Sequence, residues 1–186
     1  MDDVNAIVSG NVADGWIVKP SSGKTDIVVE IPTGVEPEKV TVEVPSTAKV
    51  KPNGAKVKVV NSGHDVSSYI NVPAADSTTG VVDFGNATLK ADLVFAETTE
   101  GDNKKNVDAV LDTAMDDNKG SATIKSAKPG LYYSMEASND LLFPAGDNTK
   151  SGGATMATGI TVDIDKPNKP TGNAVFYRIK VSLTAE

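Results

Sequence analysis

The sequence predicts an all-β protein: an antiparallel β-sandwich, immunoglobulin-like or jelly-roll-like, with one short helix near residues 106–115. Two observations carry this prediction. Apolar and polar residues alternate in many short segments, which is the pattern of half-buried strands. Turn-forming Gly, Pro, Asn and Asp residues separate these segments at intervals of about 8–12 residues, as in sandwiches and barrels.

The clearest strand is the last one, in residues 173–184. Five apolar residues at a period of two fall on one side of an extended chain there: Val175, Tyr177, Ile179, Val181 and Leu183. A strand of this length with one apolar face must be covered by a second sheet. Further strands are expected near residues 4–8, 16–18, 26–31, 40–44, 48–51, 55–59, 66–72, 81–84, 89–95, 121–126, 131–137 and 160–164.

A tight hairpin is predicted at Asn53-Gly54, between residues 48–51 and 55–59. Asn-Gly tolerates positive φ at both central turn positions, which a two-residue hairpin requires. The lysines of these two strands would then share one exposed face or lie along a sheet edge: Lys49, Lys51, Lys56 and Lys58. Lysines in such places are typical of a solvated face and discourage aggregation between edges.

The helix is predicted from a change of period in residues 106–115. Four apolar residues there follow the i, i+3, i+4, i+7 spacing: Val107, Val110, Leu111 and Ala114. Asn106 stands where an N-cap is expected. The small, polar stretch 74–80 is the best candidate for an internal boundary. It would divide an N-terminal β region, 1–75, from a C-terminal sandwich region, 76–186, unless the chain forms one continuous domain.

Composition excludes several classes of function. The formal net charge is −7, which argues against nucleic acid or an anionic membrane surface as a partner. No apolar run has the length of a membrane span. The start, Met1-Asp2-Asp3, lacks the features of a signal peptide, so we expect either a cytosolic protein or a mature secreted form. The chain has no cysteine, which rules out disulfides and thiolate chemistry.

Residues 126–183 carry a resemblance to a known family. Pro129-Gly130-Leu131-Tyr132-Tyr133 is followed by Ser138-Asn139-Asp140-Leu141 and by Phe176-Tyr177-Arg178-Ile179-Lys180-Val181. This order resembles the C-terminal β modules of large secreted bacterial cell-surface proteins. Such modules usually place a Trp shortly after the Asp-Leu, whereas Leu142-Phe143 stands here. The resemblance implies an extracellular, non-catalytic module.

No motif in the sequence indicates catalysis. The only histidine lies in Ser62-Gly63-His64-Asp65, and three adjacent residues rarely point at one another as a triad requires, so a turn is expected. Asp112, Asp116 and Asn118 lack the bidentate Glu of a calcium-binding EF-hand loop. Asp163 and Asp165 share one face of a strand and read as surface carboxylates rather than a cation site. We therefore expect no enzyme, no cofactor and no metal.

Two features concern glycans. Five aromatic residues could form a sugar-stacking platform, although with so few aromatics most should lie in the core: Trp16, Tyr69, Tyr132, Tyr133 and Tyr177. Asn86-Ala87-Thr88 is a glycosylation sequon, which has meaning only in a eukaryotic secretory route.

The functional prediction is an extracellular structural subunit that self-assembles into a surface layer, appendage or filament. Its partners would be copies of itself, joined by strand pairing or strand exchange. Val4, Ala6 and Val8 give the N-terminal segment a short apolar face at period two, so they are the predicted assembly residues. The competing interpretation is that this segment pairs within its own sheet. The alternative function is a carbohydrate-binding module of a secreted protein.

Overall fold

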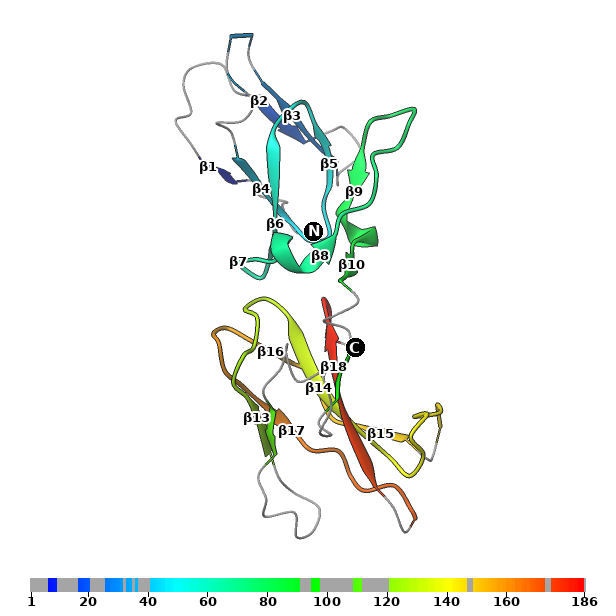
Figure 1. Cartoon of the computed structure of the whole chain (residues 1–186). Coiled ribbons are helices and arrows are strands. Elements are labelled where there is room, and N and C mark those ends of the chain that lie inside the picture. Colours follow the sequence, from blue (N-terminus) through cyan, green and yellow to red (C-terminus); the bar gives the residue numbers. More distant parts are fainter. Residues whose placement is uncertain are drawn as a thin grey trace. The chain divides into compact units, whose positions relative to one another are not determined.

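The computed structural model describes residues 7–9, 17–20, 26–31, 33–34, 36, 41–90, 95–97, 109–111, 121–146, 149–172 and 175–185. Strands dominate these residues, and the only helical turns among them are the short 3-10 segments Ser67–Tyr69 and Phe84–Asn86. The prediction of an all-β, sandwich-like fold is confirmed (Figure 1).

The chain forms two compact units, Met1–Thr88 and Leu89–Glu186. The division lies later than the predicted boundary after residue 75. The reason is strand β9 (Val82–Asp83), which follows the polar stretch 74–80 and pairs with β5 (Lys49–Pro52) of the first unit. A run of small polar residues therefore marks a loop inside the first unit.

The first unit contains two four-stranded sheets. One has the order β1 (Ile7–Ser9), β4 (Thr41–Pro45), β6 (Lys56–Asn61), β7 (His64–Asp65), and the other β2 (Ile17–Pro20), β3 (Asp26–Glu30), β5, β9. The short strands β8 (Ile70–Asn71) and β10 (Thr88–Leu89) pair separately.

The first unit departs from a purely antiparallel sandwich in two places. Strand β3 pairs with β5 in parallel, and so does β4 with β6. The chain passes from one sheet to the other at each step from β3 to β6. Two strands that are neighbours in one sheet are therefore separated along the sequence by a strand of the other sheet. Such a crossover returns the chain in the same direction, which produces parallel pairs.

The predicted hairpin at Asn53-Gly54 is wrong for the same reason. Strands β5 and β6 do not pair, because they belong to different sheets. Gly54 does have a positive φ of 73°, but among the described residues Asn53 is not in this region, so the turn is a corner between sheets. The two-residue hairpin lies instead between β6 and β7, where Ser62 and Gly63 have φ values of 49° and 82°.

The core of the first unit consists of β-branched residues from both sheets. The alternation predicted for residues 40–44 is confirmed, since Val42 and Val44 are fully buried. The core also includes Val59 of the same sheet, together with residues of the other sheet, of β8 and of the connecting segments: Ile27, Val29, Ala48, Val50, Val66, Ile70, Val82 and Phe84.

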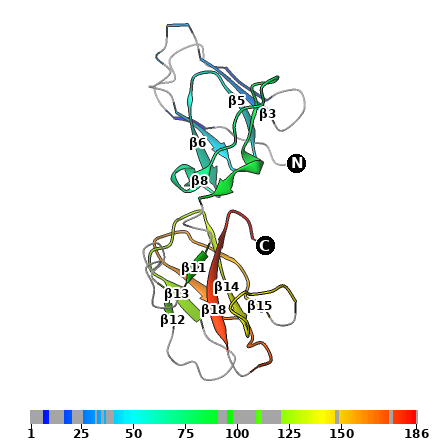
Figure 2. The same cartoon turned by 45° about the vertical axis from the view of Figure 1, so that its right-hand side comes forward.

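The second unit also has two sheets, and all its strand pairs are antiparallel. The larger contains β11 (Phe95–Glu97), β18 (Phe176–Ser182), β14 (Tyr132–Ser138) and β15 (Thr149–Ser151), with β16 (Thr155–Met156) also on β14. The smaller contains β12 (Ala109–Leu111), β13 (Ser121–Ile124) and β17 (Val162–Asp165). Figure 2 shows the long arrows of β14 and β18 side by side.

The core of the second unit lies between these sheets and confirms two predicted alternations. On β14 the buried residues are Tyr133, Met135 and Ala137, and on β18 they are Ile179 and Val181. The smaller sheet contributes the buried residues Ala122, Ile124, Val162 and Ile164.

The predicted helix is wrong over residues 109–111, and the rest of 106–115 lies outside the described residues. Ala109–Leu111 forms β12, with Val110 opposite Thr123 of β13. Val and Leu at helical spacing also suit a strand, and Val has a weak helix propensity. Pairing with β13 completes the smaller sheet, so tertiary context overrides the local pattern.

Candidate functional site

The candidate site is the solvent-facing side of β14 and β18, the strands that carry the family resemblance. They pair over seven consecutive residues, from Tyr132 opposite Ser182 to Ser138 opposite Phe176. Because side chains alternate along a strand, the residues between the buried positions face outward. The outward face therefore brings together one polar set: Tyr132, Ser134, Glu136, Arg178, Lys180 and Ser182.

The two adjacent tyrosines, Tyr132 and Tyr133, have different surroundings. Tyr133 is 1% exposed, and its hydroxyl oxygen accepts a hydrogen bond of 2.8 Å from the backbone N–H of Lys128. A buried tyrosine that bonds back to the backbone a few residues upstream is a known corner motif of β-sandwiches. Tyr132 is half-buried on the opposite face. The Pro129-Gly130 turn is thus tied to the strand that follows it.

The Ser138–Leu141 turn is held by its own side chains. The Ser138 hydroxyl accepts the N–H of Asp140 at 3.1 Å, and the Asp140 carboxylate accepts the N–H of Leu142 at 2.9 Å. The Asn139 amide donates to the carbonyl of Thr171 at 2.8 Å, which joins the turn to the segment before β18. The conformation of this motif is therefore determined by these polar residues.

An ion pair lies beside this turn. Arg178 donates from Nε and Nη2 to the same Glu136 oxygen, at 2.7 and 2.6 Å. The guanidinium carbon lies 4.3 Å from the centre of the Phe143 ring, a cation–π distance. Phe143 follows the Ser138–Leu141 turn by two residues. Arg178 therefore contacts both a carboxylate and an aromatic ring beside the turn.

A polar hollow lies next to Glu136. It has a volume of about 180 Å³ and is lined by Ser134, Glu136, Ser151, Gly152, Ala154, Lys180 and Ser182. Ser151 pairs with Glu136 and Thr155 with Tyr133, so three residues, 152–154, lie opposite two on β14. This is a β-bulge, a feature over-represented at sheet edges and next to active sites.

Gly152 is required at the start of the bulge. A Cβ at this position would overlap the carbonyl oxygen of Asp165 on β17. The same residue donates its N–H to the carbonyl of Met135 at 2.8 Å. Gly153, by contrast, has open space around its missing Cβ. The close approach of β17 therefore accounts for a glycine at the first of these positions.

Sequence reasoning identified none of the hollow's residues as a site. Two signals were available: the polar residues that alternate along the two strongest strands, and the Gly152-Gly153 pair between short strands. Neither signal locates the hollow from the sequence alone. The register of β14 against β18 and the bulge are needed to bring its residues together.

The turn predicted for Ser62–Asp65 is confined to Ser62 and Gly63, and His64–Asp65 forms strand β7. The Asp65 carboxylate accepts the N–H of Ser67, the first residue of the 3-10 turn Ser67–Tyr69, at 3.0 Å. Asp163 and Asp165 share an exposed face, and the Thr123 hydroxyl donates to Asp163 at 2.5 Å. Within the described ranges, no group of three or more His, Cys, Asp or Glu residues could hold a metal ion. Asp112, Asp116 and Asn118 lie outside those ranges.

The four lysines do not share one face, because β5 and β6 belong to different sheets. Lys49 pairs with Asp83 at 3.4 Å, and Lys58 pairs with Glu43 at 3.5 Å. Lys51 and Lys56 are exposed. Both strands are central in their sheets, so these lysines do not lie along an edge.

The described tyrosines do not form a sugar-stacking platform, the less favoured of the two arrangements considered for the aromatic residues. Tyr133 and Tyr177 lie on the core-facing side of the sheet, since Tyr177 is opposite buried Ala137, whereas Tyr132 lies on the other side. Tyr69 belongs to the first unit, and Trp16 is outside the described residues. Asn86 and Thr88 of the sequon are both exposed.

Of the predicted assembly residues, only Val8 is described. It lies in β1, opposite Val42 of β4, so residues 7–9 pair within their own sheet. Strand β1 is the first strand of that sheet and has three residues. Val4 and Ala6 lie outside the described residues.

Comparisons with protein-family models, with curated proteins and with solved structures found no match to this chain. In the part of the chain that the structure describes, no helix has the length and apolar character needed to cross a membrane.

Proposed function

We propose that the protein is an extracellular, non-catalytic structural subunit that assembles with copies of itself into a surface layer, appendage or filament. The observation that carries the proposal is the β14–β18 pair. The segments that resemble bacterial surface modules lie far apart in sequence, yet they pair in register over seven residues. Their Tyr133, Asp140 and Arg178 side chains each make a specific contact in the second unit.

Assembly would use strand edges. A strand at a sheet edge presents unpaired N–H and C=O groups, to which a strand of another chain can add. Strand β1 is such an edge, and its pairing with β4 covers three residues. A short edge strand is released at low cost, so the N-terminal segment, with Val4, Ala6 and Val8, would exchange between subunits. The donor would then occupy the β4 edge of its neighbour in the same register.

Engineered cysteines test this exchange, because the natural chain has none. Val8 and Val42 are directly opposite in an antiparallel pair. Such residues have Cα atoms about 4.5–5.5 Å apart, a separation that a disulfide bridges. The double variant Val8→Cys/Val42→Cys would be oxidised over a range of protein concentrations and run on a non-reducing gel.

Exchange predicts a ladder of disulfide-linked subunits that grows with concentration and collapses on reduction. The two single variants are the matched controls, since each has no partner in register and should give at most a background dimer. Complete conversion to an intrachain disulfide at every concentration would overturn strand exchange and leave β1 as an internal strand.

A carbohydrate-binding module is the second candidate function. The observation that favours it is the hollow beside Glu136, where serine hydroxyls line the outward face of the sheet. Retained binding to an insoluble glycan by a protein that stays monomeric would support this candidate over assembly.

A further inference from the structure

Asn53-Gly54 is the only Asn-Gly pair in the sequence, and it lies at the corner where the chain leaves β5 for the other sheet. Both residues are exposed, and both lie between β5 and β6 rather than within a strand. Residues of a strand ladder are held by backbone hydrogen bonds, whereas a connecting segment on the surface moves more freely. The corner is therefore open to a reaction that the flanking strands would resist.

The two groups that can react at this corner are adjacent along the chain. Among the described residues, neither the backbone N–H of Gly54 nor the side-chain amide of Asn53 makes a hydrogen bond. Gly54 has a φ of 73°, which glycine adopts without steric cost, and the absence of a Cβ leaves its nitrogen accessible. A nucleophile held next to its electrophile in one molecule reacts far faster than the same two groups in separate molecules. The Gly54 nitrogen and the Asn53 side-chain carbonyl carbon, Cγ, form such a pair, since a bond between them closes a five-membered ring.

From these features we propose that Asn53 is a site of spontaneous covalent modification in the folded protein, through a cyclic imide. The Gly54 nitrogen gives its proton to hydroxide and bonds to Cγ of Asn53. The bond from Cγ to the side-chain nitrogen breaks, and this nitrogen takes a proton from water and leaves as ammonia. Water then adds to either carbonyl of the ring and opens it, which leaves aspartate or iso-aspartate at position 53. The reaction needs only water and hydroxide, and the inference depends neither on subunit assembly nor on glycan binding.

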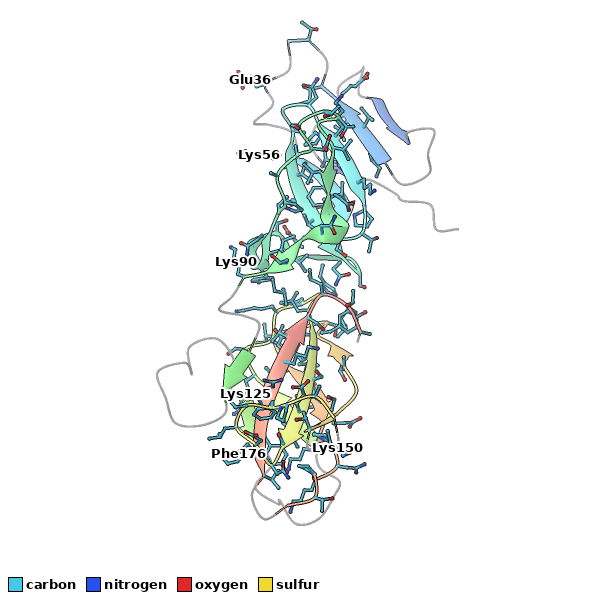
Figure 3. The ribbon with its side chains drawn as sticks, turned by 90° about the vertical axis from the view of Figure 1, so that its right-hand side faces the viewer. Glu36, Lys56, Lys90, Lys125, Lys150 and Phe176 are labelled. Carbon is cyan, nitrogen blue, oxygen red and sulfur yellow. The ribbon has the colours of Figure 1, made fainter. Side chains whose placement is uncertain are left out.

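The surroundings of the corner accommodate the charged product. The new carboxylate is exposed and lies close in sequence to two exposed lysines, Lys51 of β5 and Lys56 at the start of β6, the second of which is labelled in Figure 3. In iso-aspartate the former side-chain Cβ becomes part of the main chain, so the connection between the two sheets becomes longer. Its two ends are held by the fully buried Val50 and Val59. We therefore expect the iso-aspartate form to lower the melting temperature of the first unit more than the aspartate form does.

The test incubates the full-length, folded protein at mildly alkaline pH in water enriched in a heavy oxygen isotope. Trypsin then releases residues 50–56 as one peptide, because Lys51 precedes a proline and is not cut. Mass spectrometry should show that Asn53 is replaced by two products of equal mass, each carrying one oxygen from the solvent and separable by chromatography. A synthetic peptide of residues 50–56 gives the rate in an unfolded chain. Most of the folded protein should be converted in the time that the peptide needs for complete conversion.

Two other asparagines of the same chain are internal controls. Asn168 is exposed and lies outside a strand, as Asn53 does, but the residue after it is Lys169, whose Cβ hinders approach to the backbone nitrogen. Asn71 is exposed but lies in β8 and precedes the β-branched Val72. Both should remain asparagine when Asn53 has reacted.

Variants at the corner separate the contributions of the two residues. Asn53→Gln should abolish the reaction, because the ring would need six members and closes more slowly. Gly54→Ala should slow the reaction strongly, since it adds a Cβ beside the nitrogen at a positive φ. Ala55→Ser keeps the Asn-Gly pair and is the matched control that should react as the wild type does. Thermal melting of each variant before incubation shows whether the fold is retained.

Hydroxylamine gives a second readout on the wild-type protein, because it attacks the cyclic imide and cuts the chain at that point. The folded protein should yield the fragments 1–53 and 54–186. Three results would overturn the proposal: a folded protein that keeps Asn53 intact and uncut while the peptide reacts, conversion of Asn168 as fast as that of Asn53, or aspartate as the single product. The first would mean that the corner prevents ring closure, the second that the Asn-Gly pair has no special reactivity, and the third that water attacks the side chain directly.

Discussion

Tyr133→Phe removes a single oxygen from the core of the second unit. The ring stays in place between Leu131 and Met135, both fully buried, and the backbone N–H of Lys128 loses its 2.8 Å acceptor. The variant therefore tests the bond that ties the Pro129-Gly130 turn to β14. Tyr132→Phe is the matched control, because it removes the same oxygen from the adjacent, half-buried residue.

The loss of stability expected for Tyr133→Phe depends on how deeply the Lys128 N–H is buried. Removing one partner and leaving a buried donor unsatisfied costs about 1–3 kcal/mol. Lys128 is half-buried, so water reaches its N–H in part, and we expect the lower half of that range, about 1–2 kcal/mol. For a unit of roughly 100 residues this lowers the melting temperature by about 4–16 °C. Tyr132→Phe should cost less than about 0.5 kcal/mol.

Differential scanning calorimetry is the suitable assay, because two units can unfold in two transitions. Tyr133→Phe should move one transition downward and leave the other unchanged, whereas Tyr132→Phe should move neither appreciably. Equal shifts in the two variants, or no shift in either, would refute the role assigned to the Tyr133 hydroxyl.

Three further predictions concern local features. Gly152→Ala should destabilise the second unit by about 1–3 kcal/mol through overlap with β17, while Gly153→Ala, in open space, should be near neutral on urea unfolding. Glu136→Gln removes the charge that pairs with Arg178 and should lower the free energy of unfolding by about 1–3 kcal/mol. Glu43→Gln, at the more exposed 3.5 Å pair with Lys58, should lower it by less than about 1 kcal/mol, and calorimetry compares the two variants. Hydrogen bonds from the Thr79 N–H, the Thr79 hydroxyl and the Thr78 N–H lower the pKa of Asp76. Asp76 therefore contributes stability above about pH 4, and this stability is lost as the pH falls through its lowered pKa. Thermal melts between about pH 5 and pH 3 should show a smaller loss of melting temperature with falling pH in Asp76→Asn than in the wild type.

The sequence predicts the strands best where one face is buried. The period-two pattern on β14 and β18 identifies their core residues, because alternation and burial express the same physical constraint. The same rule locates Val42 and Val44 in the first unit.

Strand pairing is less predictable from the sequence, since it depends on contacts between distant segments. Asn53-Gly54 has the composition of a hairpin turn, yet the chain uses it to change sheets. The Val110-Leu111 spacing fits a helix, yet pairing with β13 makes it a strand. In both cases a tertiary contact outweighs a local preference of about 1 kcal/mol or less.

The candidate hollow was not predictable for the same reason. Its residues come from β14, from β18, from the end of β15 and from the bulge that follows it, and only the register of these strands brings them together. In Figure 3, Phe176 marks the start of β18 and Lys150 the middle of β15, two strands that border β14 on opposite sides.

Electron microscopy of the purified, full-length protein tests the central claim of self-assembly most directly. Negatively stained samples at rising protein concentration should show filaments or sheets with a regular subunit repeat, and these should disappear when residues 1–11 are deleted while the remaining protein stays folded. Dispersed particles at every concentration, with a monomer mass by light scattering, would contradict the assignment as a structural subunit.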